Sequence, residues 1–450
     1  SYFSLVAILF LGLITQAQSK KWTLEECVKY ALENNISIKQ SELDTQTATI
    51  DKKSAFGNLL PSINASTSHS WNIGLNQDIT TGLLRNQTTQ FTSTGMNVGI
   101  DIYKGLQNQN NLRRANLALV ASKYQLLKMQ EDIALNVANA FLQVLFNKEN
   151  LKVQLEQLAI NEKQLARSSE LVSVGVVPRG DLLDIKASVA QTRQNVVAAE
   201  NTLLISKLSL SQLLQLKDFE NFDVVDVMDI NNNATILAQS PSAIIDKAKE
   251  SRTELKIAQT NLEIAQKNLA IAKGAFQPSL QGFYGFNSRI SYADVAVISG
   301  GVISTKPANP FWTQFSDNKG QSFGAQLSIP IFNGLATKNN VERSKVNLQK
   351  ATIALEQQNL NLERTIYTAF TDAKGALKAN ESAISSFEAR QEAYNYAKEK
   401  FAVGLMNSFD YNQAQTLLVN AQSEVLRTKY DSIFKIKILE FYFGIPIIKN

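Results

Sequence analysis

The feature that most constrains this chain is a 70-residue stretch, from Gly105 to Gly175, with no proline and no glycine between its ends. As continuous α-helix at about 1.5 Å per residue it spans roughly 105 Å, whereas helices of globular domains average about 11–12 residues. One face follows a heptad pattern whose members include small residues: Ala115, Leu119, Ser122, Leu126, Met129 and Ile133. Small residues allow close packing but bury little area per turn, so we expect an elongated helix over about 105–174 with neighbours on more than one side.

Before this helix the hydrophobic period changes from helical to alternating. Apolar and polar residues alternate from Ile63 to Leu75 and again from Met96 to Ile102. This pattern predicts an antiparallel hairpin over about 61–103 with one apolar face. Its strands exceed the roughly 9–11 residues that a tilted membrane strand needs, so the apolar face requires either protein cover or lipid.

Helices are predicted on both sides of the hairpin and the long helix. Thr23 and Glu26 form a capping box for a helix that we expect to run to about Leu60, where Pro61 ends it. A turn at 174–178 follows the long helix, and Asp181 is placed to cap a helix over about 181–216. The polar segment 217–240 is predicted to be a connector.

The second half of the chain repeats the first. Ala31, Ile38 and Pro61 match residues 217 positions later, and Gly105, Gly175 and Asp181 match residues 229 positions later. We therefore expect two tandem repeats, residues 19–216 and 241–444, followed by a tail at 445–450. The second repeat contains a helix, a hairpin at about 278–332 with a longer loop, a long helix at about 334–403 and a helix at about 409–443.

Composition excludes most kinds of chemistry. Cys27 is the only cysteine and His69 the only histidine, so a disulfide within the chain is impossible and a histidine-based metal site or catalytic triad is nearly excluded. We expect no enzyme activity, no metal and no cofactor. The net charge of +5 is spread among acidic residues along the helices, which does not favour nucleic acid as a partner.

The first residues have the character of a secretory leader. Leu5 to Ile14 is an apolar run, and the small residues at 15–17 favour cleavage after Ala17 or Gln18, so residues 1–18 are predicted to be a signal peptide. The alternative, a membrane anchor, is disfavoured because the run falls short of the roughly 20 residues that span a bilayer.

Four strands in one chain are too few to close a barrel, so we expect closure by oligomerisation. Three copies would supply twelve strands and twelve helical columns. The fold class predicted from the residues is thus mixed α and β, with two tandem structural repeats and four strands per chain.

At this point the chain resembles the TolC-like outer-membrane efflux channels, with a narrower likeness around 74–89 to members from Bacteroidetes. The resemblance covers nearly the whole mature chain. It depends on the doubled layout and on the segment Leu24-x-x-x-Val28-x-x-Ala31-Leu32-x-x-Asn35. It also depends on the Pro that begins each hairpin, on Tyr/Phe-x-Gly-Leu at the end of each hairpin, and on two Val-Gly turns with Asp six residues after Gly. It implies a homotrimer whose strands form one transmembrane β-barrel of twelve strands and whose helices form a long α-helical barrel. Such an assembly would be a passive duct in the outer membrane that extends into the periplasm. Its partners would be a periplasmic adaptor and an inner-membrane transporter of RND or ABC type, with the connector and tail around the middle.

The resemblance also assigns two sites. The turns Val174-Gly175-Val176 and Val403-Gly404-Leu405 match helical tips that meet the adaptor; the alternative is that they are ordinary tight turns between helices. Asp410 matches an acidic residue of a periplasmic aperture, where the alternative is a plain helix N-cap. Gln413 stands where a second acidic residue is expected, Met406 where an arginine is expected, and Asp181 is the equivalent position of the first repeat.

Two questions stay open at this level. Aromatic residues of the second hairpin are candidates for an interfacial belt, although ordinary packing explains each of them equally well: Phe283, Tyr284, Phe286, Tyr292, Phe311, Trp312 and Phe315. The other function class compatible with the helices is a coiled-coil periplasmic scaffold without a pore, which has no use for lipid-facing strands.

Overall fold

A computed structural model describes residues 21–77, 84–219, 221–226, 234–300 and 302–447. The predicted signal peptide at 1–18, the hairpin loop at 78–83, the asparagines at 231–233 and the last residues of the tail, 448–450, lie outside this part. The chain divides into two compact units, each considered by itself. Unit 1 comprises Ser1–Asp44, Lys123–Ile257 and Leu355–Asn450, and unit 2 comprises Thr45–Ser122 and Ala258–Ala354.

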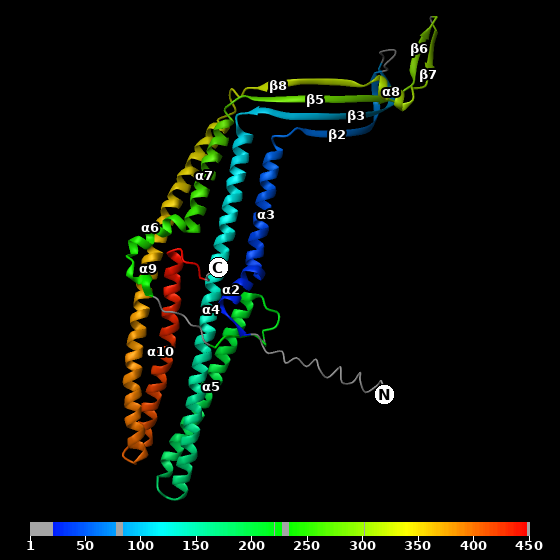
Figure 1. Ribbon diagram of the computed structural model, residues 1–450. Helices are drawn as coiled ribbons and strands as arrows, with labels where there is room; N and C mark the ends of the chain where they lie inside the picture. The colour runs from blue at the N-terminus through cyan, green and yellow to red at the C-terminus, as the bar shows by residue number, and fades with distance from the viewer. Residues whose placement is uncertain (1–20, 78–83, 220, 227–233, 301, 448–450) are drawn as a thin grey trace, which may run out of the picture. The chain divides into compact units, whose positions relative to one another are not determined.

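The described chain is mixed α and β and mostly helical (Figure 1). The helices are α2 (Leu24–Asn34), α3 (Ile36–Gly57), α4 (Gln107–Ser173), α5 (Arg179–Leu214), η1 (Ala234–Ala238), α6 (Pro241–Ser251), α7 (Thr253–Gly274), α8 (Phe311–Asp317), α9 (Ala336–Ala402) and α10 (Ser408–Tyr442). The strands are β1 (Lys21–Trp22), β2 (Ser62–Gln77), β3 (Leu84–Lys104), β4 (Asp223–Val224), β5 (Ser279–Ser291), β6 (Val295–Ser299), β7 (Val302–Lys306) and β8 (Gly320–Ser328).

The helix bounds follow the two sequence offsets. The helices α6 and α7 begin and end 217 residues after α2 and α3, and α9 begins and ends 229 residues after α4. Both long helices contain 67 residues. The glycine-to-glycine spacing therefore predicted their positions to within two residues at each end.

Two of the hydrophobic cores in the described part of unit 1 are built from equivalent positions. In the first, Cys27, Val28 and Ala31 of α2 pack with residues of α4 and α5. In the second, Ile244, Ile245 and Ala248 of α6 pack with residues of α9 and α10. Cys27 thus occupies the place that Ile244 fills in the second core. It is fully buried and acts there as a small apolar side chain.

One expectation about the first helix is wrong. The chain does not run as one helix from Thr23 to about Leu60, because Asn35 adopts an extended conformation (ψ 131°) and separates α2 from α3. The Asn35 side chain donates to the carbonyl of Leu213 at 2.9 Å and accepts from the amide of Ser37 at 2.9 Å. Arg252 breaks the second repeat at the equivalent position (ψ 129°). The capping box of Thr23 and Glu26 is present as predicted.

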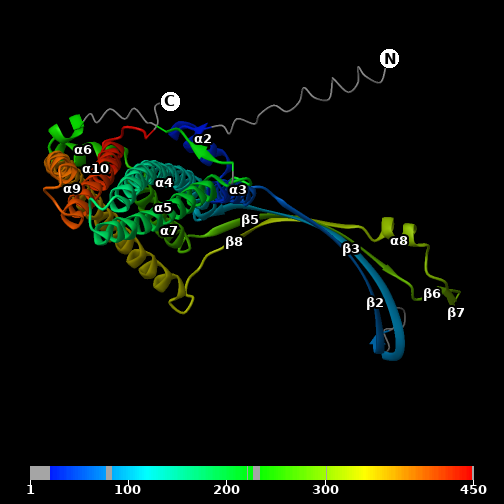
Figure 2. The same ribbon diagram turned by 90° about the horizontal axis from the view of Figure 1, so that it is seen from below.

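Unit 2 contains an antiparallel sheet in the order β2-β3-β5-β8 (Figure 2). A bulge between Asp101 and Tyr103 interrupts the pairing of β3 with β5. Where the sheet meets the helices, Gly105 and Gly274 pack backbone against backbone. A Cβ on Gly274 would lie 2.3 Å from the oxygen of Gly105, so only glycine fits at this position.

The second hairpin differs from the longer loop that we expected. Its extra residues form the small hairpin β6–β7 and the short helix α8. The strand β8 ends at Ser328, earlier than the predicted 332, because Pro330 lies two residues further on and cannot donate to a strand ladder. In the described part of the chain, no helix is both long enough and apolar enough to cross a membrane.

Candidate functional site

The sheet of unit 2 has two chemically different faces. Residues paired directly across strands share a face, so the register assigns each side chain. One face carries most of the large apolar residues of all four strands: Ile63, Trp71, Ile73, Met96, Val98, Tyr284, Phe286, Ile290, Phe323 and Leu327. Several of them are exposed in the single chain, including Ile73 at 81% and Phe323 at 82%.

The opposite face is polar and rich in small residues: Ser62, Asn64, Ser66, Ser93, Asn97, Gly285, Asn287, Arg289, Ser322 and Gly324. Phe283 is an exception on this face and lies against Gly324, where an added Cβ would come within 3.0 Å of the ring. Phe283 is therefore not part of the same aromatic surface as Tyr284 and Phe286. Both edges of the sheet, on β2 and β8, end in strands without a further neighbour among the described residues.

The helical hairpins of unit 1 end in turns of one type. In the first, the amide of Val176 donates to Leu171 and that of Gly175 to Val172, with φ +75° at the glycine. In the second, the amides of Leu405 and Gly404 donate in the same way, with φ +79° at Gly404. This Schellman pattern needs a left-handed residue, which explains the glycines.

Both turns expose apolar side chains. Val174 and Val176 are 70% and 67% exposed, and Val403 and Leu405 are 70% and 78% exposed. A tight turn requires only the glycine, so the apolar flanks are not needed for the turn itself. Paired exposed apolar side chains at a helix end are typical of a surface that contacts another protein.

The aperture candidates Asp410 and Gln413 lie beside the second turn and Asp181 beside the first, but neither aspartate caps a helix in the way expected. The N-cap of α10 is Asn407, whose side chain accepts from the amide of Asp410 at 2.8 Å and donates to its carboxylate at 2.9 Å. The N-cap of α5 is Pro178, and Asp181 lies inside the first turn. The N-cap role suggested for both aspartates is thus wrong. Asp410 and Gln413 are exposed.

Asp181 instead joins the two tips of unit 1. The Ser408 hydroxyl lies 3.0 Å from Oδ1 of Asp181 and 3.2 Å from Oδ2 of Asp184, and Ser408 is 1% exposed. The sequence gives no signal for this contact, since 227 residues separate the partners and Ser408 corresponds to Arg179 in the first repeat.

A small aromatic core supports the second tip. The hydroxyl groups of Tyr394 and Tyr411 are 2.9 Å apart, and the rings of Phe401 and Tyr411 stack at 4.6 Å. Burial, together with the hydrogen bond between Tyr411 and Tyr394, raises the pKa of Tyr411 well above its usual range. Met406, which stands where an arginine was expected, packs against this core. It contributes apolar contact there and no charge.

A charged cluster fixes the start of the connector. The strands β1 and β4 pair in parallel, and Lys148 of α4 lies 2.9 Å from Asp223 and 2.5 Å from Asp226. Lys207 lies 2.9 Å from Asp223, and Lys21 pairs with Asp226. Hydrogen bonds from Lys148 and Lys21 lower the pKa of Asp226 to about 2. Burial opposes ionisation of Asp223, but hydrogen bonds from Lys207 and Lys148 outweigh it and lower its pKa.

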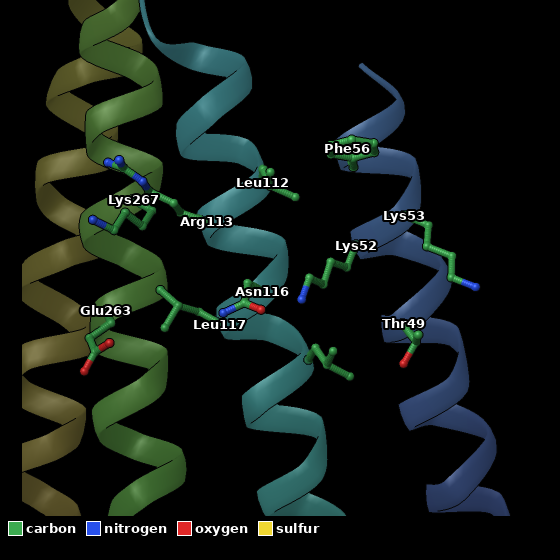
Figure 3. A pocket seen from close by; sticks show the side chains of 11 residues that line it. Thr49, Lys52, Lys53, Phe56, Leu112, Arg113, Asn116, Leu117, Glu263 and Lys267 are labelled. Atoms are coloured by element: carbon green, nitrogen blue, oxygen red, sulfur yellow. The ribbon is translucent and has the colours of Figure 1, made fainter. Parts of the chain in front are cut away.

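An open groove of about 800 Å³ runs between helices of unit 2. Figure 3 shows Lys52 of α3 extending toward Asn116 of α4, with Arg113 and Lys267 on the side of α7. Its walls combine leucines with long cations, without a nucleophile beside a base. Across the residues that the structure describes, no cluster of histidine, cysteine and carboxylate side chains is arranged to hold a metal ion.

Comparison with known proteins gives a consistent result. The sequence matches the family described as "Outer membrane efflux protein" over residues 27–215 and 244–433. It is 20% identical over 432 residues to the outer membrane protein TolC of Escherichia coli, covering 95% of this chain and 83% of TolC. It is 23% identical over 417 residues to the probable outer membrane lipoprotein SilC of Salmonella typhimurium, covering 89% and 81%.

The fold is likewise that of solved channels. The Campylobacter jejuni CmeC outer membrane channel superposes with a TM-score of 0.78 at 20% identity, covering 94% of this chain and 85% of CmeC. VceC of Vibrio cholerae gives a TM-score of 0.76 at 14% identity, covering 94% and 96%.

Proposed function

The chain belongs to the outer membrane efflux protein family, and we propose that it forms, as a homotrimer, the outer-membrane channel of a tripartite export system. In this proposal the protein is a passive duct that performs no chemistry. Its strands lie in the outer membrane and its long helices extend into the periplasm.

The observation that carries the proposal is the two-faced sheet with open edges. An apolar face on four consecutive strands, opposite a face of serine, asparagine and glycine, fits strands between lipid and water. A sheet in lipid must also close, because unpaired backbone groups cost several kcal/mol each in hydrocarbon. Three copies that pair β2 of one chain with β8 of the next would give a closed barrel of twelve strands. The scaffold alternative offers no role for this sheet.

The helical ends supply the proposed contact and gate. The exposed Val174, Val176, Val403 and Leu405 would meet a periplasmic adaptor, which connects the channel to an inner-membrane transporter of RND or ABC type. Asp410, repeated three times around the axis, would form an acidic constriction that favours cations. Gln413 adds no charge to it. The bond from Ser408 to Asp181 would help to hold the tips of one chain together.

The test is conductance in planar bilayers with purified trimers from outer-membrane fractions. We expect ohmic pores with cation preference, and we expect Asp410→Ala to raise conductance and weaken that preference. Glu388→Ala is the matched control, since Glu388 is an exposed carboxylate on α9 away from the tip. Recovery of a non-conducting monomer would refute the channel. Equal conductance of wild type and Asp410→Ala would move the constriction elsewhere without refuting the pore.

A further inference from the structure

The short helix α8 lies along the edge of β5 beyond the point where β8 ends, and its side chains form hydrogen bonds with the β5 backbone there. The pairing of β5 with β8 reaches Asn287 and Gly320, but β5 continues to Ser291. Beyond that point, Gln314 accepts from the amide of Ser291 at 3.0 Å and donates to its carbonyl at 2.9 Å. Asn318 donates to the carbonyl of Arg289 at 2.6 Å. Side chains of α8 and the residue after it thus satisfy three backbone groups that would otherwise form an open edge.

The helix lies against the apolar face of the sheet. The Ser288 hydroxyl donates to the carbonyl of Phe315 at 3.0 Å, and the rings of Phe286 and Phe315 lie 6.0 Å apart. Phe286 and Ser288 pair with Met96 and Thr94, so all four share that face. Figure 2 shows α8 beside the far part of β5. Arg289, in contrast, points to the polar face and lies 3.9 Å over the ring of Phe91.

Away from the strand, α8 exposes most of one aromatic side chain and part of a second. Trp312 is 75% exposed and Phe311 36% exposed. Their rings meet edge to face at 5.1 Å, and Trp312 meets Phe315 in the same way at 5.9 Å. Tryptophan has a large apolar body and one N–H donor, the combination that favours the boundary between lipid headgroups and acyl chains.

We propose that α8 is a lipid anchor, with Phe311 and Trp312 inserted at the headgroup–acyl boundary of the bilayer that surrounds the sheet. This inference rests on the proposed membrane function. Lipid is the occupant because the aromatic surface continues the apolar face of the sheet. The side-chain hydrogen bonds to three backbone groups of the β5 edge reduce the number of polar groups that would otherwise face lipid without a partner. A second copy would dock by strand pairing, and α8 blocks that edge of β5.

The chain contains three tryptophans, and they provide the test. Single-tryptophan forms of the full-length assembled trimer, with the other two changed to phenylalanine, are placed in phosphatidylcholine vesicles. The lipids carry bromine either near the headgroup or near the end of the acyl chain, and bromine quenches tryptophan emission on contact. Trp22 packs edge to face on Tyr30 in unit 1 and serves as the unquenched control. Trp71, on the apolar face of β2, serves as the quenched control.

We expect Trp312 to lose emission with both lipids, and to lose more with the bromine near the headgroup. If Trp71 is quenched and Trp312 is not, the lipid-anchor proposal is wrong and the channel proposal still stands. That result would mean that water or a neighbouring chain, and not lipid, surrounds α8. Absence of quenching at both Trp71 and Trp312 would overturn the membrane face of the sheet itself. Far-UV circular dichroism and trimer content confirm that each form is folded.

Discussion

Met96 and Asn97 are adjacent on β3 and offer a matched test of the two-faced sheet. Met96 pairs with Ala65 and Phe286 on the apolar face, and Asn97 pairs with Asn64 and Gly285 on the polar face. Both lie where all four strands are paired. Replacing each in turn with arginine adds the same side chain to the same strand at nearly the same depth. The two variants therefore differ only in the face that receives the charge.

The register predicts very different costs for the two changes. An arginine on the lipid face near the membrane midplane costs about 2–4 kcal/mol, and every 1.4 kcal/mol corresponds to about tenfold in the folding equilibrium. Three copies in a trimer raise the cost to about 6–12 kcal/mol per assembly if the sites are independent. An exposed arginine on the water-facing side costs about 0.5 kcal/mol or less. Met96→Arg should therefore reduce assembled trimer strongly, while Asn97→Arg should leave it near wild type.

The assay is the yield of heat-modifiable trimer in outer-membrane fractions, together with urea unfolding from phosphatidylcholine vesicles. Met96→Gln, which keeps the length of the side chain and adds no charge, separates the effect of charge from that of lost apolar contact. The reasoning is refuted if the two arginine variants lose similar amounts of trimer. It is also refuted if Asn97→Arg is the more damaging change.

Three further outcomes are expected. Gly274→Ala should lower the free energy of unfolding by about 1–3 kcal/mol, because the new Cβ would overlap the oxygen of Gly105. Gly375 lies inside α9 with open space around its Cβ position, so Gly375→Ala should raise the free energy of unfolding by about 0.4–1 kcal/mol in the same denaturant titration. Arg252→Met should lower the free energy of unfolding by about 3–5 kcal/mol, because it leaves the partly buried Glu131 and Glu254 without their cation. Changing both glutamates to glutamine in this variant should restore part of the stability measured by thermal unfolding. Because the pKa of Asp226 is about 2 in the folded state, the stabilisation from its ionised form is complete above pH about 4 and is lost as the pH falls toward 2. The emission of Trp22, in a form without the other two tryptophans, should report this loss. The Asp226→Asn variant should lack the part of the pH dependence that comes from Asp226.

The long helices and their ends were predictable because local chemistry determines them. Seventy residues without proline or an inner glycine, with a heptad pattern, leave few alternatives to helix, and Gly175 and Gly404 mark turns that need a positive φ. The polar and apolar faces of the sheet follow from period-two alternation in the same way. Val403 and Leu405 are exposed, and their contact with an adaptor stays a prediction.

The contacts that hold these elements in place were not predictable, because their partners are distant in sequence. The break at Asn35 depends on the carbonyl of Leu213, 178 residues away, and the role of Asp181 depends on Ser408. The asparagine pair 34–35 was a weak signal for the break, since asparagine is a poor helix former. For α8, seven residues are too few for hydrophobic period to distinguish helix from strand. This segment is helical in a context that the sequence does not reveal, because Gln314 and Asn318 form hydrogen bonds with the backbone at the edge of β5.

The two repeats reach the same interrupted helix by different chemistry. In the first, Asn35 bonds to a backbone carbonyl near the end of α5. In the second, Arg252 is 4% exposed, lies 4.0 Å over the ring of Phe441 near the end of α10, and contacts Glu131 and Glu254. The hydrogen bond from the neutral Asn35 side chain does not depend on pH, whereas the partly buried ion triad of Arg252, Glu131 and Glu254 does. Burial raises the pKa of Glu131 even though Arg252 opposes that shift. The geometry of the break is thus common to both halves of the chain, but of the two breaks only the one at Arg252 depends on ionised side chains.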